Sequence, residues 1–188
     1  MNKITGIILA GGKSSRMGRD KAFIPFQGKK MIQYSIDAMK EVCPDILICA
    51  NDPSYELFGY PVVGDNFKNI GPLGGLEAAL SVSKTEINLF APCDSPYLKP
   101  GLFIEILKRC EDYDAVVPKL DGGFIQPLAG YYSRKILPEI RQRIRVGDCK
   151  MQNLLRTVKT GYIPVKDYDM FRNMNRPGDL KFISQLST

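Results

Sequence analysis

Short apolar runs alternate with amphipathic stretches from the start of the chain to about residue 118. The run at 4–9 is short and largely apolar and stops near paired glycines, which is typical of a strand buried on both faces. Residues 31–42 carry apolar side chains at the spacing of an amphipathic helix. Further strands are expected at 45–50, 60–63, 87–91, 114–118 and 162–165, and further helices at 73–82, 99–110, 133–146, 150–158 and 178–186. Extended segments are expected at 22–26 and 124–132, and a short helix at 52–54.

This alternation of strands and helices predicts an α/β fold with three α/β/α layers and a Rossmann-like, mostly parallel sheet. The mixture of elements after residue 118 predicts an antiparallel extension of the sheet in the C-terminal half. No internal repeat, linker or block of like charge interrupts the chain. Residues 1–188 are therefore expected to form a single domain, within the usual size range.

The amino-acid composition excludes several classes of ligand and of catalytic mechanism. The chain has 44% hydrophobic and 24% charged residues, and 26 Lys+Arg against 20 Asp+Glu give a net charge of +6. That excess suits an anionic ligand, but it is too dispersed for a nucleic-acid partner. The absence of histidine excludes Ser-His-Asp and Cys-His catalysis and His-ligated zinc. Catalysis must rest on carboxylates, Lys and Arg, backbone N–H groups or a hard metal ion.

The cysteines and the apolar N-terminal run indicate the cellular compartment to expect. Five cysteines are spread along the chain without a CxxC pair, which predicts reduced, mostly buried thiols rather than disulfides or a zinc site. The apolar run at 4–9 is too short for a membrane span, and no cleavage pattern follows it. A cytoplasmic protein without a membrane partner is expected.

The polar residues collect where the expected strands end. In an open parallel sheet, ligands bind outside the carboxyl ends of the strands. Such an end is predicted at each of four places, 9–21, 51–52, 64–66 and 92–96. Each segment alone is typical of a turn, because Gly, Pro, Asn and Asp dominate turns. Their convergence on one edge favours a binding site.

The first of these loops has the most specific composition. Gly11 and Gly12 allow close approach of the backbone to a ligand. Four cations follow within nine residues, namely Lys13, Arg16, Arg19 and Lys21. Backbone donors with cations suit a polyphosphate. Neither GxxxxGK[ST] nor GxGxxG occurs, so the loop is neither a P-loop nor a dinucleotide fingerprint.

Asp94 is the candidate metal ligand. It follows an apolar strand and lies between Pro92 and Pro96, which favours a fixed carboxylate at the sheet edge; a helix-capping or turn role is the alternative. Mg²⁺ takes one or two carboxylates together with phosphate oxygens and water. A second ligand is open among Asp20, Asp65 and Asp148. Cys93 has no base beside it and is interpreted as a small buried side chain.

Two further segments are candidates for ligand contact. Residues 71–75 open a helix with little side-chain bulk, so Gly71 and Gly74 are candidate nucleotide contacts, with a purely geometric role as the alternative. Asn173 and Asn175 are two residues apart, which in an extended chain places both amides on one side. Paired amides suit a heterocycle or a phosphate, and a helix cap is the alternative.

Taken together, these motifs resemble the molybdenum cofactor guanylyltransferase family, within the wider nucleotide-diphospho-sugar transferase-like group. The resemblance rests on LAGGKSSRMGRDK at 9–21, Asn51, Asp65, GPLGG at 71–75, CDSP at 93–96, QPL at 126–128 and NMNRP at 173–177. These motifs run in family order over nearly the whole chain. Residues 120–165 carry little motif.

The resemblance implies transfer of GMP from GTP to molybdenum-loaded molybdopterin, with Mg²⁺ and release of pyrophosphate. It implies nucleotide contacts from Leu9, Ala10, Gly11, Gly12, Lys21, Asn51, Asp65 and Asp94, catalytic roles for Arg16, Lys21 and Asp94, the metal on Asp94, and pterin contacts from Gln126, Asn173 and Asn175. Other cofactor-biosynthesis proteins and recipient molybdoenzymes are the partners that such a role implies.

The residue chemistry agrees with that reading and leaves alternatives. A phosphate acceptor is already an anion, so no strong base is needed, in keeping with a chain without histidine. The first loop favours guanine, since cytidylyl relatives usually carry a different Gly/Ala pattern there. A cytidylyltransferase on the same pterin, another small nucleotidyltransferase and a non-catalytic nucleotide-binding module remain as alternatives. A Rossmann-type redox domain lacks its fingerprint.

Overall fold

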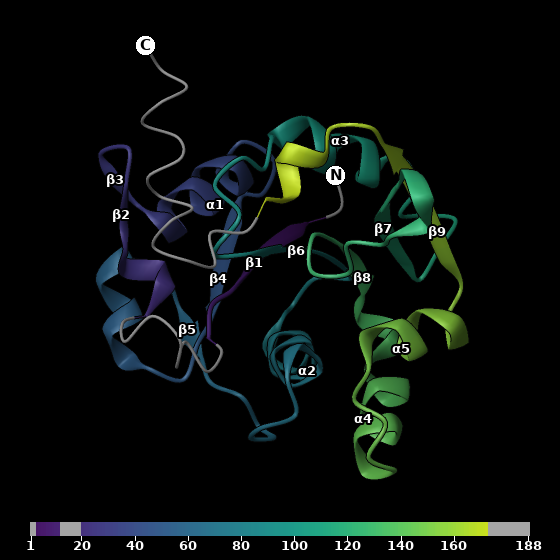
Figure 1. Cartoon of the computed structure of the whole chain (residues 1–188). Coiled ribbons are helices and arrows are strands. Elements are labelled where there is room, and N and C mark those ends of the chain that lie inside the picture. Colours follow the sequence, from purple (N-terminus) through teal and green to yellow (C-terminus); the bar gives the residue numbers. More distant parts are fainter. Residues whose placement is uncertain (1–2, 12–19, 173–188) are drawn as a thin grey trace.

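A mixed sheet forms the centre of the molecule. Within the described residues, 3–11 and 20–172, the computed structural model has seven strands in the order β5–β4–β1–β6–β8–β7–β9 (Figure 1). Their bounds are β1 Ile4–Leu9, β4 Asp45–Cys49, β5 Val62–Val63, β6 Ile87–Pro92, β7 Ala115–Leu120, β8 Gly130–Ser133 and β9 Thr160–Val165. A separate hairpin pairs β2 (Pro25–Phe26) with β3 (Lys29–Lys30).

The pairing confirms the expected mostly parallel sheet. β1 is an inner strand and is parallel to both neighbours, with Ile7 opposite Leu47 on one side and Phe90 on the other. β8 pairs antiparallel with β6 and with β7, and β7 is parallel to β9. In the described part of the chain, β8 therefore runs against the other six strands. The predicted antiparallel part is confirmed, and it lies inside the sheet, between β6 and β7.

Helices cover both faces of the sheet, as a three-layer fold requires. Their bounds are α1 Met31–Lys40, α2 Pro72–Val82, α3 Pro100–Leu107, α4 Leu137–Arg145 and α5 Met151–Thr157. Short 3₁₀ helices lie at η1 Lys21–Phe23, η2 Pro53–Phe58, η3 Asp121–Gly123, η4 Arg134–Ile136 and η5 Tyr168–Phe171. In Figure 1, α1 and α3 lie above the sheet and α2, α4 and α5 below it. Within 3–11 and 20–172, no helix combines the length and apolar character that crossing a bilayer demands.

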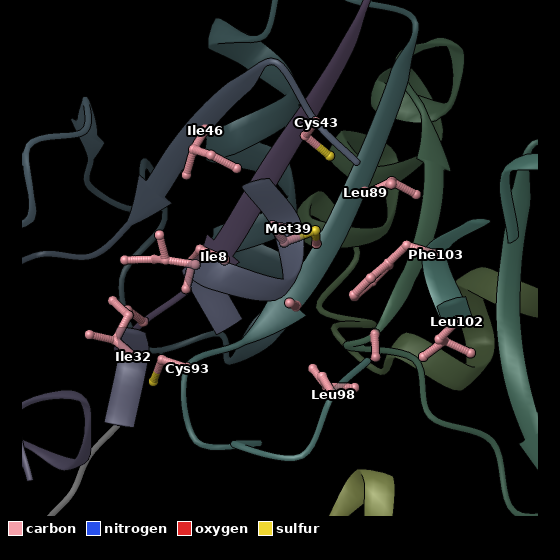
Figure 2. Packing of buried hydrophobic residues seen from close by; sticks show 14 of the residues in the cluster. Ile8, Ile32, Met39, Cys43, Ile46, Leu89, Cys93, Leu98, Leu102 and Phe103 are labelled. Atoms are coloured by element: carbon pink, nitrogen blue, oxygen red, sulfur yellow. The ribbon is translucent and has the colours of Figure 1, made fainter. Parts of the chain in front are cut away.

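The alternation of side chains along β1 divides the core between these layers. Ile8 is fully buried in a cluster with Met39 of α1 and Phe103 of α3, and Figure 2 shows these side chains gathered on one side of the sheet. Ile7, its neighbour, belongs to a second cluster with Leu76 of α2 and Ile140 of α4. Burying a large apolar side chain contributes about 1.5–3 kcal/mol, so both clusters hold the strands that carry the carboxyl-edge loops.

Some predicted elements differ in kind or in bounds. The segment expected to be extended at 22–26 begins as η1, because the Asp20 carboxylate accepts a hydrogen bond from the Ala22 N–H and caps a 3₁₀ turn. The segment at 124–132 becomes a strand only at Gly130. The expected helices at 99–110 and 133–146 are shorter, since a 3₁₀ turn precedes α4 and α3 ends at Leu107. The helix expected at 178–186 lies outside the described residues.

Candidate active site

A cleft of about 730 Å³ opens at the carboxyl edge of the sheet. Three strands end there side by side, because Leu9 of β1 pairs with Cys49 of β4 and with Pro92 of β6. The lining comes from the loops after these strands and after β5, from η1 and η2, from the start of α2 and from the segment before β8. It consists of Leu9, Ala10, Gly11, Asp20, Lys21, Cys49, Asn51, Asp52, Tyr55, Asp65, Asn69, Gly71, Pro72, Gly75, Pro92, Cys93, Asp94 and Leu128.

The loop after β1 begins on the floor of this cleft. The Ala10 N–H donates to the Cys49 carbonyl at 2.8 Å, and the Cys93 N–H donates to the Leu9 carbonyl at 3.0 Å. These bonds continue the parallel pairing past the strand ends. Gly11 then has φ +134°, a conformation that L side chains rarely adopt. Gly12 and Arg16, with Lys13 and Arg19, lie outside the described residues.

Lys21 and Asp94 meet across the cleft although 73 positions separate them. The Lys21 Nζ lies 3.5 Å from Asp94 Oδ2, and the two side chains are 22% and 18% exposed. Lys21 begins η1, and Asp94 lies in the turn directly after β6. The ammonium and the carboxylate are thus both partly buried and both face the same cleft. A cation and an acid in this arrangement can bind one metal–phosphate ligand between them.

A second wall of the cleft is formed by Asn51 and Asp65. The Asp65 N–H donates to Asn51 Oδ1 at 2.8 Å, and Asn51 Nδ2 donates to Asp65 Oδ2 at 3.0 Å. This reciprocal pair ties the loop after β4 to the loop after β5. It holds a carboxylate and an amide at fixed positions, an arrangement suited to the polar edge of a ribose or base.

The N-terminus of α2 closes the cleft with glycines. Gly71 precedes the helix at φ +75°, and Pro72 occupies its first turn. Gly75 lies so close to β1 and β4 that a Cβ there would be 3.1 Å from Leu9 Cδ2 and 3.3 Å from Cys49 Sγ. Gly71 and Gly75 line the cleft, whereas Gly74 packs against the preceding loop, where a Cβ would be 3.1 Å from the Phe67 carbonyl oxygen.

Of the three predicted pterin contacts, the structure describes Gln126. It is half-buried between β7 and β8, and its N–H donates to the Pro118 carbonyl at 2.9 Å. Gln126 does not belong to the cleft lining, but Leu128, two residues further on, does. Asn173 and Asn175 lie outside the described residues.

The carboxylates near the cleft decide whether Mg²⁺ fits. Asp20 and Asp65 line the cleft together with Asp94, whereas Asp148 does not. Asp148 binds Asn153 Nδ2 at 2.8 Å and pairs with Arg143, and the Asn153 hydrogen bond lowers the pKa of its carboxyl. Among residues 3–11 and 20–172, no group of three acids, cysteines or histidines could hold a metal unaided. An all-oxygen set of one or two carboxylates completed by phosphate fits Mg²⁺.

The two cysteines in the cleft are poor nucleophiles. Burial raises the pKa of the Cys49 thiol to about 12, helped by the nearby Asp65 carboxylate. Burial likewise raises the pKa of Cys93, and Asp94 and Asp20 raise it further. Both thiols are therefore protonated at neutral pH. All five cysteines are free, and four of them are buried, in agreement with the predicted reduced thiols.

Tyr55 lines the cleft although no sequence motif pointed to it, whereas Gly75 and Leu128 lie in the motifs at 71–75 and 126–128 but were not predicted as contacts. Tyr55 is 1% exposed, and its hydroxyl donates to Asp20 Oδ2 at 2.7 Å. An aromatic residue in a short helix has the pattern of an ordinary core residue. The available signal was its place in η2, directly after a strand whose carboxyl end was already expected at the site.

A three-layer α/β fold with a glycine-rich, mixed-charge cleft at its carboxyl edge is typical of nucleotide-binding proteins. A sequence profile described as the MobA-like NTP transferase domain matches residues 6–161, most of the chain. The chain belongs to this family of nucleotidyltransferases.

Individual relatives agree with that assignment. The molybdenum cofactor guanylyltransferase of Vibrio vulnificus is 35% identical over 187 residues, covering 97% of this chain and 95% of its own. A probable molybdenum cofactor guanylyltransferase of Flavobacterium johnsoniae is 33% identical, covering 96% of each chain. A solved structure of molybdopterin-guanine dinucleotide biosynthesis protein A from Archaeoglobus fulgidus is 26% identical, with a TM-score of 0.81 and 97% of each chain covered.

Proposed function

We propose that this chain transfers GMP from GTP to molybdenum-loaded molybdopterin, with Mg²⁺, and releases pyrophosphate. The observation that carries the proposal is the meeting of Lys21 and Asp94 in one cleft, 3.5 Å apart. The relatives named molybdenum cofactor guanylyltransferase, which align over nearly the full chain, support the choice of guanine and of the pterin. Residues 1–188 act as one nucleotidyltransferase domain in this proposal.

The nucleotide lies along the floor of the cleft. Leu9, Ala10 and Gly11 present backbone to it, and the positive end of the α2 helix dipole, behind Gly71, faces it. The Asn51–Asp65 pair binds the ribose or guanine side. Gly74, also a predicted contact, contributes by letting α2 pack against the preceding loop rather than by touching the nucleotide.

The residues of the cleft also account for the chemistry. The acceptor is a phosphate anion, so the reaction needs no general base, and the chain has no histidine to serve as one. Asp94 holds Mg²⁺, and Lys21, with Arg16 from the first loop, neutralises the triphosphate as the pyrophosphate leaves. Bound Mg²⁺ supplies positive charge at the phosphate oxygens. Rate acceleration then comes from positioning and from charges that are already in place.

The acceptor binds beside Leu128. In this proposal Gln126, Asn173 and Asn175 contact the pterin, which places the terminal phosphate of the acceptor next to the nucleotide. Other cofactor-biosynthesis proteins and recipient molybdoenzymes are the proposed macromolecular partners.

A side-by-side assay of pyrophosphate release tests the function. With molybdenum-loaded molybdopterin and Mg²⁺, we expect release with GTP to exceed release with CTP by at least tenfold. Faster release with CTP would identify a cytidylyltransferase. Tight binding of GTP without any release, in a preparation that is folded by circular dichroism, would favour the non-catalytic binding module.

Removal of divalent metal should abolish turnover, because Lys21 is the only cation among the described residues that line the cleft, and it cannot by itself neutralise a triphosphate. Dialysis against EDTA is expected to lower pyrophosphate release by at least a hundredfold, and added Mg²⁺ should restore it. Circular dichroism of the dialysed protein is the control, since no described part of the core depends on a metal. Full activity in EDTA would contradict the metal role of Asp94.

A further inference from the structure

The strongest feature that the proposed function leaves unexplained is the contact between Tyr55 and Asp20. Tyr55 is nearly fully buried at 1% exposure, and its hydroxyl donates to Asp20 Oδ2 at 2.7 Å. Both residues line the nucleotide cleft, 35 positions apart in the sequence. A buried tyrosine hydroxyl bonded to a carboxylate is a strong, directional contact.

Asp20 links Tyr55 to the turn that carries Lys21. Its second carboxylate oxygen, Oδ1, accepts the Ala22 N–H at 3.1 Å and so caps the 3₁₀ turn η1, in which Lys21 is the first residue. The backbone of Lys21 is therefore held between a cap on one side and buried Ala22 on the other. The direction of the Lys21 side chain toward Asp94 depends on that turn.

Aromatic packing fixes the other end of the same turn. The Phe23 ring lies edge-on to the Tyr55 ring at 4.9 Å between centroids, and Phe58 lies 5.5 Å from Phe23. Lys30 Nζ lies 5.4 Å and 5.3 Å from the Phe23 and Phe58 ring centroids, respectively. Tyr55 thus holds η1 at two points, through its hydroxyl at Asp20 and through its ring at Phe23.

We propose that Tyr55 is a positioning residue for nucleotidyl transfer: its hydroxyl fixes the Asp20 cap and thereby aims Lys21 at the triphosphate. The proposal rests on the proposed function of Lys21. It also assigns Asp20 a role other than metal binding, since both of its carboxylate oxygens accept hydrogen bonds from the chain. Without the hydroxyl, Asp20 Oδ2 can turn and compete with the triphosphate for the Lys21 ammonium.

The Tyr55→Phe substitution removes one hydroxyl and keeps the ring. We expect kcat for pyrophosphate release to fall by about tenfold to a hundredfold, because small displacements of a positioning group cost rates of this order. The matched control is Tyr34→Phe, which also loses a 2.7 Å hydroxyl bond, in this case to the Phe26 carbonyl outside the cleft. That control should keep kcat within about twofold. Assays are run well below the melting temperature of each variant.

A double-mutant cycle separates positioning from a merely structural role. If Tyr55 acts through Lys21, then Lys21→Ala combined with Tyr55→Phe should be no slower than Lys21→Ala alone. Multiplied losses in the double variant would overturn the proposal, as would a normal kcat in Tyr55→Phe. If Lys21→Ala itself keeps full activity, the proposed function of Lys21 fails instead, which is a distinguishable result.

A second variant covers the case in which Tyr55→Phe does not fold. Asp20→Asn can keep the cap by accepting the Ala22 N–H with its one amide oxygen and can donate from Nδ2 to the tyrosine oxygen, but it removes the charge that strengthens both bonds. We expect a smaller loss of kcat, about threefold to tenfold, and the same absence of further loss in combination with Lys21→Ala. An unchanged kcat in Asp20→Asn, or losses that multiply with Lys21→Ala, would overturn the proposal.

Discussion

Replacing Asp94 by alanine should lower the rate of GMP transfer by about a hundredfold or more, with the fold intact. Asp94 is the acid that faces Lys21 in the cleft, and in the proposed reaction it binds the metal that neutralises the triphosphate. Loss of a single preorganised electrostatic contact in an active site commonly costs a factor of this size. Pyrophosphate release with saturating GTP and Mg²⁺ measures the effect.

Two comparisons make this result specific. Lys21→Ala should show a loss of similar size, since it removes the other half of the same arrangement. Lys108→Ala, which breaks an exposed pair with Glu105 on α3, should leave the rate within about twofold. A folded Asp94→Ala variant that turns over at the normal rate would remove the basis for the proposed metal site.

The second large effect concerns stability. Glu77 of α2 is 1% exposed, and its carboxylate accepts from Arg141 Nε and from Asn66 Nδ2, each at 2.8 Å. Arg141→Ala leaves this buried charge with one neutral partner, which is strongly destabilising at fully buried sites. Because Arg141 is 45% exposed, we expect the free energy of unfolding to fall by about 2 kcal/mol and the melting temperature by roughly 4–8 °C.

The control for this prediction lies one turn further along the same helix. Arg145 is exposed and makes no ion pair among those the described residues show, so Arg145→Ala should change the unfolding free energy by less than about 0.5 kcal/mol. Adding Glu77→Gln to Arg141→Ala should recover part of the loss, because it removes the uncompensated charge. Urea denaturation measures all three variants, and equal stability of Arg141→Ala and the unsubstituted protein would show that the pair contributes nothing.

The parts of the fold that local pattern specifies could be predicted well. β1 is predicted at the bounds it has, Ile4–Leu9, because a short, largely apolar run that stops near paired glycines is typical of a buried parallel strand. The helix after Pro72 is likewise close to its observed bounds. The partners of β8 could not be predicted. Its place between β6 and β7 depends on pairing with strands that are distant in sequence or not adjacent to it by pattern alone.

The site was predictable at the level of loops and less so at the level of side chains. Lys21, Asp94, Asn51 and Asp65 converge because all four follow strand ends on one edge of the sheet. The sequence predicted Gly74 as a contact, but Gly75 lines the cleft. Which of the two faces the cleft depends on how α2 is rotated about its axis, because successive helix residues are about 100° apart. The sequence could not separate Asp148 from the other candidate metal ligands. The structure does so, because Asp148 lies between α4 and α5, where it contacts Arg143 and Asn153 and does not line the cleft.

The most direct test of the account is the anomalous signal of Mn²⁺, used in place of Mg²⁺, in crystals grown with a GTP analogue that cannot be cleaved. The predicted result is one strong peak within about 2.5 Å of an Asp94 carboxylate oxygen, bonded to the triphosphate, with Lys21 Nζ on a phosphate oxygen of the same nucleotide. A nucleotide and metal bound away from Asp94, or a Lys21 that touches no phosphate, would contradict it.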